Sequence, residues 1–409
     1  MGPGGGRLHR RSRRRGAARV TLPRGYDGVA IACPVTVRYA RHSDRSAHWH
    51  IGTALRELIA QAGIAKAEVD GLAASSFTLG PDTSIALTEH FGLSPRWLDW
   101  IPTGGASGVM ALRRAARAVQ AGDASVVACI GGDTADAGAF GDLVRNFSRF
   151  SREAVYPYGA AGPNGVFALI TDHYMRTHGA ERADFGRVVV AQRSHARANP
   201  NALLGAKPLT IDDYLAAPPV ATPLHLFDCV MPCAGAEGFL VMTVERARRL
   251  GLPYAVIRGA IERHDAYADD PIAERGGWAM DRDTLYAQAG LGPGDVDCLQ
   301  AYDDYPVIVL QQIEDLGFCA KGEGAAFVRR HDLGVGGDFP VNSCGGQLGC
   351  GQAGAAGGFL PVVEALRQVV RRPIGAQLPD ARIALASGYG MVTFDRCLAT
   401  AAAILEGRP

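Results

Sequence analysis

A pattern that occurs twice along the chain is the feature that most restricts its fold. The first copy begins in a glycine-rich turn at residues 104–108 and continues through an amphipathic segment into the apolar run VVACIGGD. The second copy begins at residues 345–358 and continues in the same way into ARIALASGYG. Apolar residues recur at helical spacing in both amphipathic segments, and both apolar runs are typical of buried strands. Two copies of loop, helix and strand in one order predict an internal duplication.

Strands and helices alternate along most of the sequence, which predicts an α/β protein with a largely parallel sheet covered by helices on both faces. We expect an N-terminal half at residues 27–253 and a C-terminal half at residues 254–409, because a helix ends and a new strand begins near residue 253. Residues from about 137 to 245 are irregular and aromatic, and we expect a loop subdomain over a functional site there. Residues 1–26 predict a disordered basic tail.

The composition excludes several classes of protein. Of 409 residues 47% are hydrophobic and 20% charged, as in globular proteins. The net charge is +1, but eight arginines precede the first acid, Asp27, and without them 34 basic residues face 41 acidic ones, a net charge of −7. An acidic body argues against nucleic-acid binding. No apolar run reaches the roughly 18 residues that predict a membrane span.

The nine cysteines are an odd number spread along a long chain, which indicates no disulfide framework and a reducing cytoplasm. No two pairs of them have the spacing of a zinc site, so we expect no bound metal.

The first candidate site is the glycine-rich turn at residues 104–108. Free N–H groups and the dipole of the helix that follows can bind an oxyanion or a phosphate there. A tight structural turn explains the same glycines equally well. Ser107 lacks the G-x-S-x-G surroundings of a nucleophile, and we expect its hydroxyl to cap the helix.

The second candidate site is AYDDYP, residues 301–306, which follows an apolar strand and opens an apolar helix. Asp303 or Asp304 can cap that helix, with Pro306 in its first turn. Tyrosines and carboxylates at the carboxyl end of a strand also occupy the usual place of catalytic groups in open α/β sheets. Both interpretations are open on the sequence alone.

The third candidate site is GCGQAG, residues 349–354, which formally matches G-x-G-x-x-G. A dinucleotide site needs an acidic residue about 20 positions further on, and the nearest acid, Glu364, lies inside the next predicted helix, so nicotinamide binding is not expected. Cys350 is either a nucleophile activated by a helix N-terminus or a buried structural thiol.

These three segments, in this order on duplicated halves, resemble the thiolase superfamily, most closely its sterol-carrier-protein-X and lipid-transfer-protein branch. The similarity extends from about residue 27 to 406. It implies a five-layered αβαβα fold with two mixed, mostly parallel sheets and a loop subdomain. It also implies a homodimer and an acyl-CoA substrate, with no cofactor bound besides the coenzyme A that is part of that substrate.

The chain departs from this family at each catalytic position. Gly105 stands where the acyl-carrying cysteine would begin a Cys-Ala-Ser-Gly motif, Gln352 where the histidine of Gly-His-Pro stands, and Ala386 where the second cysteine stands. Thiolysis needs both cysteines and the histidine. The usual mechanism therefore cannot operate unless Cys350 or Cys344 has become the nucleophile.

Retro-aldol cleavage of a β-hydroxyacyl-CoA needs a base, an acid and a site for the enolate oxygen, but no covalent intermediate. The resembling branch includes aldolases that release a short acyl-CoA from a shortened steroid side chain and work with a small zinc-ribbon/OB-fold partner. The resemblance thus implies a C–C lyase. The alternatives are an acyltransferase with a substitute cysteine, and a non-catalytic protein that binds acyl-CoA.

Five residues have expected roles in such a lyase. Tyr302 stands at the position of a histidine in the branch and is expected to be the principal acid or base, with a lowered pKa. Asp303 would orient it or the helix, and Tyr305 is a second candidate. Gln352 and the Gly105 amide would hold the thioester oxygen.

Overall fold

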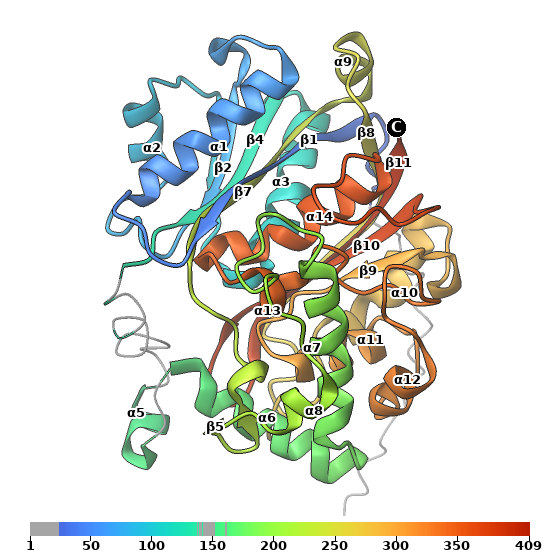
Figure 1. The fold of residues 1–409 in the computed structure, drawn as a ribbon. Coiled ribbons are helices and arrows are strands. Elements are labelled where there is room, and N and C mark those ends of the chain that lie inside the picture. The colour runs from blue at the N-terminus through green and yellow to red at the C-terminus, as the bar shows by residue number, and fades with distance from the viewer. Residues whose placement is uncertain (1–23, 137, 139–140, 142–151, 160–161) are drawn as a thin grey trace, which may run out of the picture.

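The computed structural model describes residues 24–136, 138, 141, 152–159 and 162–409 (Figure 1). Most of the predicted basic tail and residues 142–151 of the predicted loop subdomain lie outside the described residues. No helix of the described part of the chain is long and apolar enough to cross a membrane.

A nine-stranded sheet in the order β3-β2-β4-β7-β1-β8-β11-β10-β9 forms the framework. A separate two-stranded sheet pairs β5 (Pro219–Ala221) with β6 (Leu224–His225). The strands of the large sheet are β1 (Val29–Ala40), β2 (Gly71–Ser75), β3 (Trp97–Trp100), β4 (Val126–Asp133), β7 (Ala234–Thr243), β8 (Tyr254–His264), β9 (Cys298–Gln300), β10 (Ile383–Val392) and β11 (Cys397–Arg408).

The order of the strands confirms the predicted duplication. The run β2-β4-β7-β1 of the first half is repeated by β9-β10-β11-β8 of the second. Strand directions repeat as well: β2–β4 and β9–β10 are parallel, whereas β4–β7 and β10–β11 are antiparallel. The first half adds β3 at its edge. The boundary near residue 253 stays a prediction, and β8 begins at Tyr254.

The prediction of two mostly parallel sheets needs correction, although the α/β class and the mixed sheet are confirmed. β1 pairs with β8 through residues 30–32, which joins the halves into one sheet. Of the eight neighbouring pairs in the described sheet, only β2–β3, β2–β4 and β9–β10 are parallel. The reason is that β7 and β11 each run opposite to both neighbours. β11 follows β10 through a short turn, and such a turn joins only antiparallel strands.

The predicted five layers are present, with the single sheet supplying both β layers. α1 (Ala47–Ala62) and α2 (Ser84–Phe91) cover the outer face of the first half. α3 (Ser107–Ala121) and α14 (Leu360–Val369) lie between the halves and contact strands of both (Figure 1). α10 (Trp278–Ala289) packs on β8 and β11 from the other side. The predicted apolar stripe of α3 is buried in this core: Val109, Leu112, Ala116 and Val119.

Two helices of the long central connection, α6 and α7, lie against the C-terminal half. α6 and α7 pack against α11, and α7 also packs against α13 (Figure 1). Because α11 follows the carboxyl end of β9, this packing covers the edge where the second candidate site lies. The bounds of the helices not given above are α5 (Arg152–Val155), α6 (Gly162–His178), α7 (Arg182–Ala196), α8 (Ile211–Leu215), α9 (Val244–Arg249), α11 (Pro306–Asp315), α12 (Gly324–Arg330) and α13 (Gly346–Cys350).

Candidate active site

The glycine-rich turn of the first half lies directly against Tyr302. The turn is the 3-10 segment η2 (Gly104–Ala106), which leads into α3. A Cβ atom on Gly105 would lie 2.2 Å from Cε2 of Tyr302 and 2.2 Å from the main-chain oxygen of Tyr389. Carbon atoms in contact are ordinarily about 3.5–4.0 Å apart. Position 105 therefore has room for a glycine but not for a cysteine, because the tyrosine ring takes up the adjoining space.

Tyr302 is held at both its main chain and its phenol. Its backbone N–H donates to Gln312 Oε1 at 3.2 Å, and Gln312 Nε2 donates to the Tyr302 carbonyl at 2.7 Å. The Ser387 hydroxyl donates to Gln312 Oε1 at 2.6 Å, which ties β10 to the same side chain. At the other end, Gln352 Nε2 donates to the phenolic oxygen at 3.2 Å. The structure thus brings Tyr302, Gly105 and Gln352 together.

The expected lowering of the Tyr302 pKa is wrong. Burial raises the pKa of this phenol well above its usual value, and the charges of Asp304 and Asp303 raise it further. Hydrogen bonding from Gln352 and Gln347 acts in the opposite direction and is outweighed. Tyr302 is consequently a neutral phenol at neutral pH, and its resting form is a proton donor.

Asp303 supports α13 rather than Tyr302. Its carboxylate accepts hydrogen bonds from the backbone N–H groups of Gln347 at 2.9 Å and Leu348 at 3.2 Å, in the first turn of α13. Burial raises the pKa of Asp303 to about 7, although these hydrogen bonds favour the charged form. α11 begins after Tyr305 without a side-chain cap. The carboxylate therefore anchors the helix that leads to Gln352, and the expectation that an aspartate caps α11 is wrong.

Asp304, which the sequence offered only as a helix cap or as one of two carboxylates at a strand end, is a functional candidate in the structure. Its side chain is buried, and its Oδ1 atom has no hydrogen-bond partner among the described residues. Burial raises the pKa of Asp304 well above its usual value and the Asp303 charge adds to this, while hydrogen bonding from Tyr302 opposes it. A buried carboxyl with an unpaired oxygen beside a phenol can exchange a proton with it. The only signal in the sequence was the pair of adjacent acids at the end of a strand.

Two further tyrosines, Tyr305 and Tyr389, stand beside Tyr302 and Asp304. Tyr305 donates its hydroxyl to Asn164 Oδ1 at 2.5 Å, and its ring stacks on Phe167 with 4.0 Å between centroids. This hydroxyl is therefore engaged with α6. Tyr389 is buried, its ring stacks on Trp278 at 5.9 Å, and its hydroxyl has no partner among the described residues. The sequence interpretation did not single out Tyr389, whose only signal was its place at the end of a strand.

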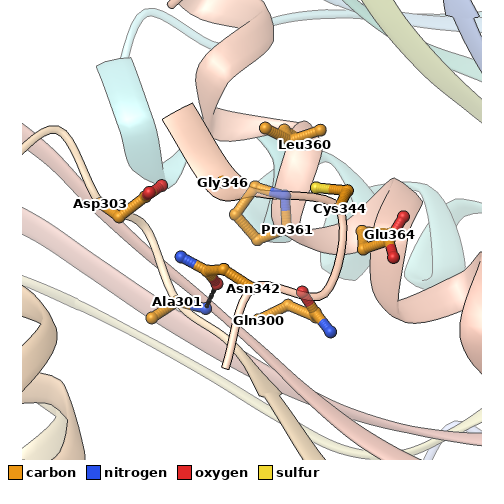
Figure 2. Close-up of a pocket in the computed structure, with 9 residues that line it drawn as sticks. All are labelled: Gln300, Ala301, Asp303, Asn342, Cys344, Gly346, Leu360, Pro361 and Glu364. Atoms are coloured by element: carbon orange, nitrogen blue, oxygen red, sulfur yellow. Dashed lines mark hydrogen bonds between the residues drawn. The ribbon is translucent and has the colours of Figure 1, made fainter. Parts of the chain in front are cut away.

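A narrow cavity without room for a water molecule lies beside Asp303. Figure 2 shows Asp303 at one side of it and the hydrogen bond from the Ala301 backbone N–H to Asn342 Oδ1, at 2.7 Å. Tyr302, Asp304 and Gln352 do not line it, so we place the chemistry at these residues and not in the cavity. Its lining residues are Gln300, Ala301, Asp303, Asn342, Cys344, Gly346, Leu360, Pro361 and Glu364.

Comparison with known proteins places the chain in a family. Residues 264–404 match the family model described as Thiolase C-terminal domain-like. The chain is 31% identical over 380 residues to the steroid side-chain-cleaving aldolase of Thermomonospora curvata, an alignment that covers 89% of this chain and 96% of that protein. It is 32% identical over 354 residues to 17-hydroxy-3-oxo-4-pregnene-20-carboxyl-CoA lyase of Mycobacterium tuberculosis, covering 82% and 90%. This chain belongs to the thiolase superfamily.

A solved structure supports the same branch of the superfamily. The Ltp2-ChsH2(DUF35) aldolase is 30% identical to this chain and superposes with a TM-score of 0.81, covering 95% of this chain and 99% of its own. The predicted resemblance and fold are thus confirmed. The two sequence relatives are an aldolase and a lyase by name, so the chain is an enzyme of the C–C lyase type within the superfamily and the acyltransferase alternative is not favoured.

The cysteines offered as substitute nucleophiles have structural surroundings. Cys350 is the last residue of α13, so it does not stand at a helix N-terminus as the sequence interpretation allowed. Its thiol donates to the Cys344 carbonyl at 3.2 Å and accepts from Asn199 Nδ2 at 3.4 Å. The pKa of Cys344 is raised well above its usual value by the hydrogen bond with Cys350 and by burial. A thiol is nucleophilic only as a thiolate, and at Cys344 the Gly346 backbone hydrogen bond that favours the thiolate is outweighed.

Ser107 is also structural, though not as the expected helix cap. Its hydroxyl donates to the Ile101 carbonyl at 2.8 Å and accepts from the Thr103 backbone N–H at 3.2 Å, which fastens the chain before η2.

Within the described residues, no group of three or more histidine, cysteine or acidic side chains could hold a metal ion.

Proposed function

We propose that this thiolase-superfamily enzyme cleaves the Cα–Cβ bond of a β-hydroxyacyl-CoA by a retro-aldol reaction and releases a short acyl-CoA. The observation that carries the proposal is the contact between Gly105 and the Tyr302 ring, which leaves no room for an acyl-carrying side chain. Bond cleavage must then proceed without an acyl-enzyme. The names of the two relatives support a steroid side chain as the acyl part.

The proposed steps use the residues around Tyr302. Asp304, as a carboxylate, removes the proton of the β-hydroxyl group, the Cα–Cβ bond breaks, and its electron pair moves to the thioester as an enolate. Gln352 Nε2 and the Gly105 amide hold the enolate oxygen, because hydrogen-bond donors stabilise developing negative charge. Tyr302, which is neutral at rest, gives a proton to the α-carbon. Asp304 lies next to this phenol and passes the proton it took from the substrate on to Tyr302, which restores both groups.

Replacing Tyr302 tests the proposal most simply. Tyr302→Phe keeps the ring against Gly105 but removes the proton, and we expect kcat to fall by about 10²-fold or more. Tyr286→Phe is the matched control, because it also loses a buried phenol with a hydrogen bond, to the Leu316 carbonyl at 2.9 Å, but lies outside the site. The measurement is release of short-chain acyl-CoA from a β-hydroxyacyl-CoA. Near-wild-type turnover in Tyr302→Phe refutes the assigned role.

We further propose that the chain forms a homodimer and works with a zinc-ribbon/OB-fold partner. The solved relative, named as an Ltp2 and ChsH2(DUF35) pair, supports such a partner. Co-expression with a candidate partner tests the assembly: light scattering should show two copies of each chain, and turnover should increase in the complex.

We also propose a reducing cytoplasmic setting for the enzyme. It is supported by the nine cysteines, which are all unpaired.

A further inference from the structure

A buried arginine of α7 has no acidic partner among the residues that the structure describes. Arg193, on α7, is 5% exposed, and its Cζ atom lies 5.6 Å from the ring centroid of Phe227. Phe227 belongs to the 3-10 segment η5 (Leu226–Asp228), which packs on α7. The Nε atom of Arg193 is buried and has no hydrogen-bond partner among the described residues.

The acid nearest in sequence to Phe227 is committed to other groups. Asp228 accepts hydrogen bonds from the Tyr214 hydroxyl and from the His225 backbone N–H at 2.7 Å. By contrast, the exposed Arg329 binds Asp184, on the same helix as Arg193, with two hydrogen bonds of 2.6 Å. Burial lowers the pKa of Arg193, and no charged group offsets this effect.

An unpaired buried cation is costly to folding, because desolvation is not offset by an opposite charge. Proteins place such strained groups at functional sites more often than elsewhere. The planar guanidinium donates two parallel hydrogen bonds to a carboxylate or phosphate, and an aromatic face such as that of Phe227 fixes its orientation. The missing counter-charge therefore fits an anionic group carried by a ligand.

The position of Arg193 connects it to the candidate active site. The segment after α7 is hydrogen-bonded to the end of α13, where the Leu203 backbone N–H donates to the Cys350 carbonyl at 3.1 Å. The segment after η5 is bonded to the next residues, where the Gln352 backbone N–H donates to the Met231 carbonyl at 2.8 Å. The segments that follow α7 and η5 thus attach to the strip of chain that carries Gln352. Arg193 is consequently linked to Gln352 through the segments that follow its own helix and its aromatic neighbour Phe227.

We propose that Arg193 binds an oxyanion of the acyl-CoA substrate, either a phosphate of its coenzyme A part or a carboxylate on its acyl part. The inference rests on the proposed function only in taking an acyl-CoA as the ligand. It adds a binding residue, outside the group that transfers protons, which acts on substrate affinity and not on the chemical step.

Calorimetric titration of the full-length chain tests this without turnover, so a failure of the cleavage assay does not affect the result. Arg193→Gln is compared with wild type and with Arg187→Gln, a matched control that removes an exposed arginine from the same helix. One ligand is free coenzyme A, which carries the phosphates. The other is an N-acetylcysteamine thioester with a terminal carboxylate on its acyl chain, which carries no phosphate.

We expect Arg193→Gln to lower the affinity for one of the two ligands at least tenfold, and Arg187→Gln to leave both affinities unchanged. A loss confined to coenzyme A assigns the phosphate, and a loss confined to the thioester assigns the acyl carboxylate. Thermal melting gives a second readout: Arg193→Gln should melt no lower than wild type, because it removes an uncompensated charge. Unchanged affinity for both ligands overturns the proposal, as does a lowered melting temperature together with unchanged affinity, which identifies a structural arginine.

Discussion

Replacing Gly105 by alanine perturbs the contact on which the mechanism depends. The added Cβ would lie 2.2 Å from Tyr302 Cε2 and 2.2 Å from the Tyr389 carbonyl oxygen. Carbon atoms in ordinary contact lie about 3.5–4.0 Å apart, so the Tyr302 ring must move away by about 1 Å or more. The Tyr389 carbonyl belongs to the backbone of β10 and cannot move aside as a side chain can. Overpacking of this kind costs about 1–3 kcal/mol. A displacement of about 1 Å in a catalytic group costs about 10²-fold in rate.

The assay for Gly105→Ala combines denaturant unfolding with steady-state cleavage of a β-hydroxyacyl-CoA. Gly294→Ala is the matched control, since a Cβ there meets nothing within 4 Å and the backbone is not in the left-handed region. We expect Gly294→Ala to behave like wild type, while Gly105→Ala loses both stability and about two orders of magnitude in kcat. If Gly105→Ala unfolds and turns over like the control, the contact with Gly105 does not fix the position of Tyr302.

Three other variants are predicted together. Asp304→Asn should remove the acidic limb of the pH profile of kcat, a limb that lies above the ordinary aspartate range because burial raises the Asp304 pKa; an unchanged profile would exclude Asp304 as a proton site. Cys350→Ser should keep near-wild-type kcat in the same assay, whereas a large loss would favour a catalytic thiol. Asp303 holds its proton more tightly folded than unfolded, since its pKa rises from 3.8 to about 7. The free energy of unfolding should therefore fall as pH rises through this window, and Asp303→Asn should flatten that fall in urea titrations; an equal slope in both proteins would contradict the assignment.

The duplication could be predicted because it depends on local pattern. The stripe of Val109 and Leu112 on α3 follows from helical spacing, and the repeated strand order follows from repeated local units. The pairing of β1 with β8 could not be predicted, since it joins residues more than two hundred positions apart and leaves no periodic signal. The antiparallel course of β7 was hidden for a similar reason, because a long connection precedes it.

The candidate site was only partly predictable, because residues 301–305 form no helix or strand. In such a segment neither helical nor strand periodicity tells which way a side chain points. Tyr302 turns toward Gly105, Asp303 binds the first turn of α13, and Asp304 keeps an unpaired oxygen, although the three are consecutive. Cys350 was misplaced because α13 ends at it, and the position of that helix depends on Asp303.

The intact mass of the protein during turnover distinguishes non-covalent cleavage from cleavage through an acyl-enzyme. The full-length enzyme is mixed with a β-hydroxyacyl-CoA, quenched in acid while product is forming, and weighed by mass spectrometry. We expect the unmodified mass at every time point, because no side chain at position 105 can carry the acyl group. A transient increase equal to the acyl group, mapped to Cys350 or Cys344, would contradict it.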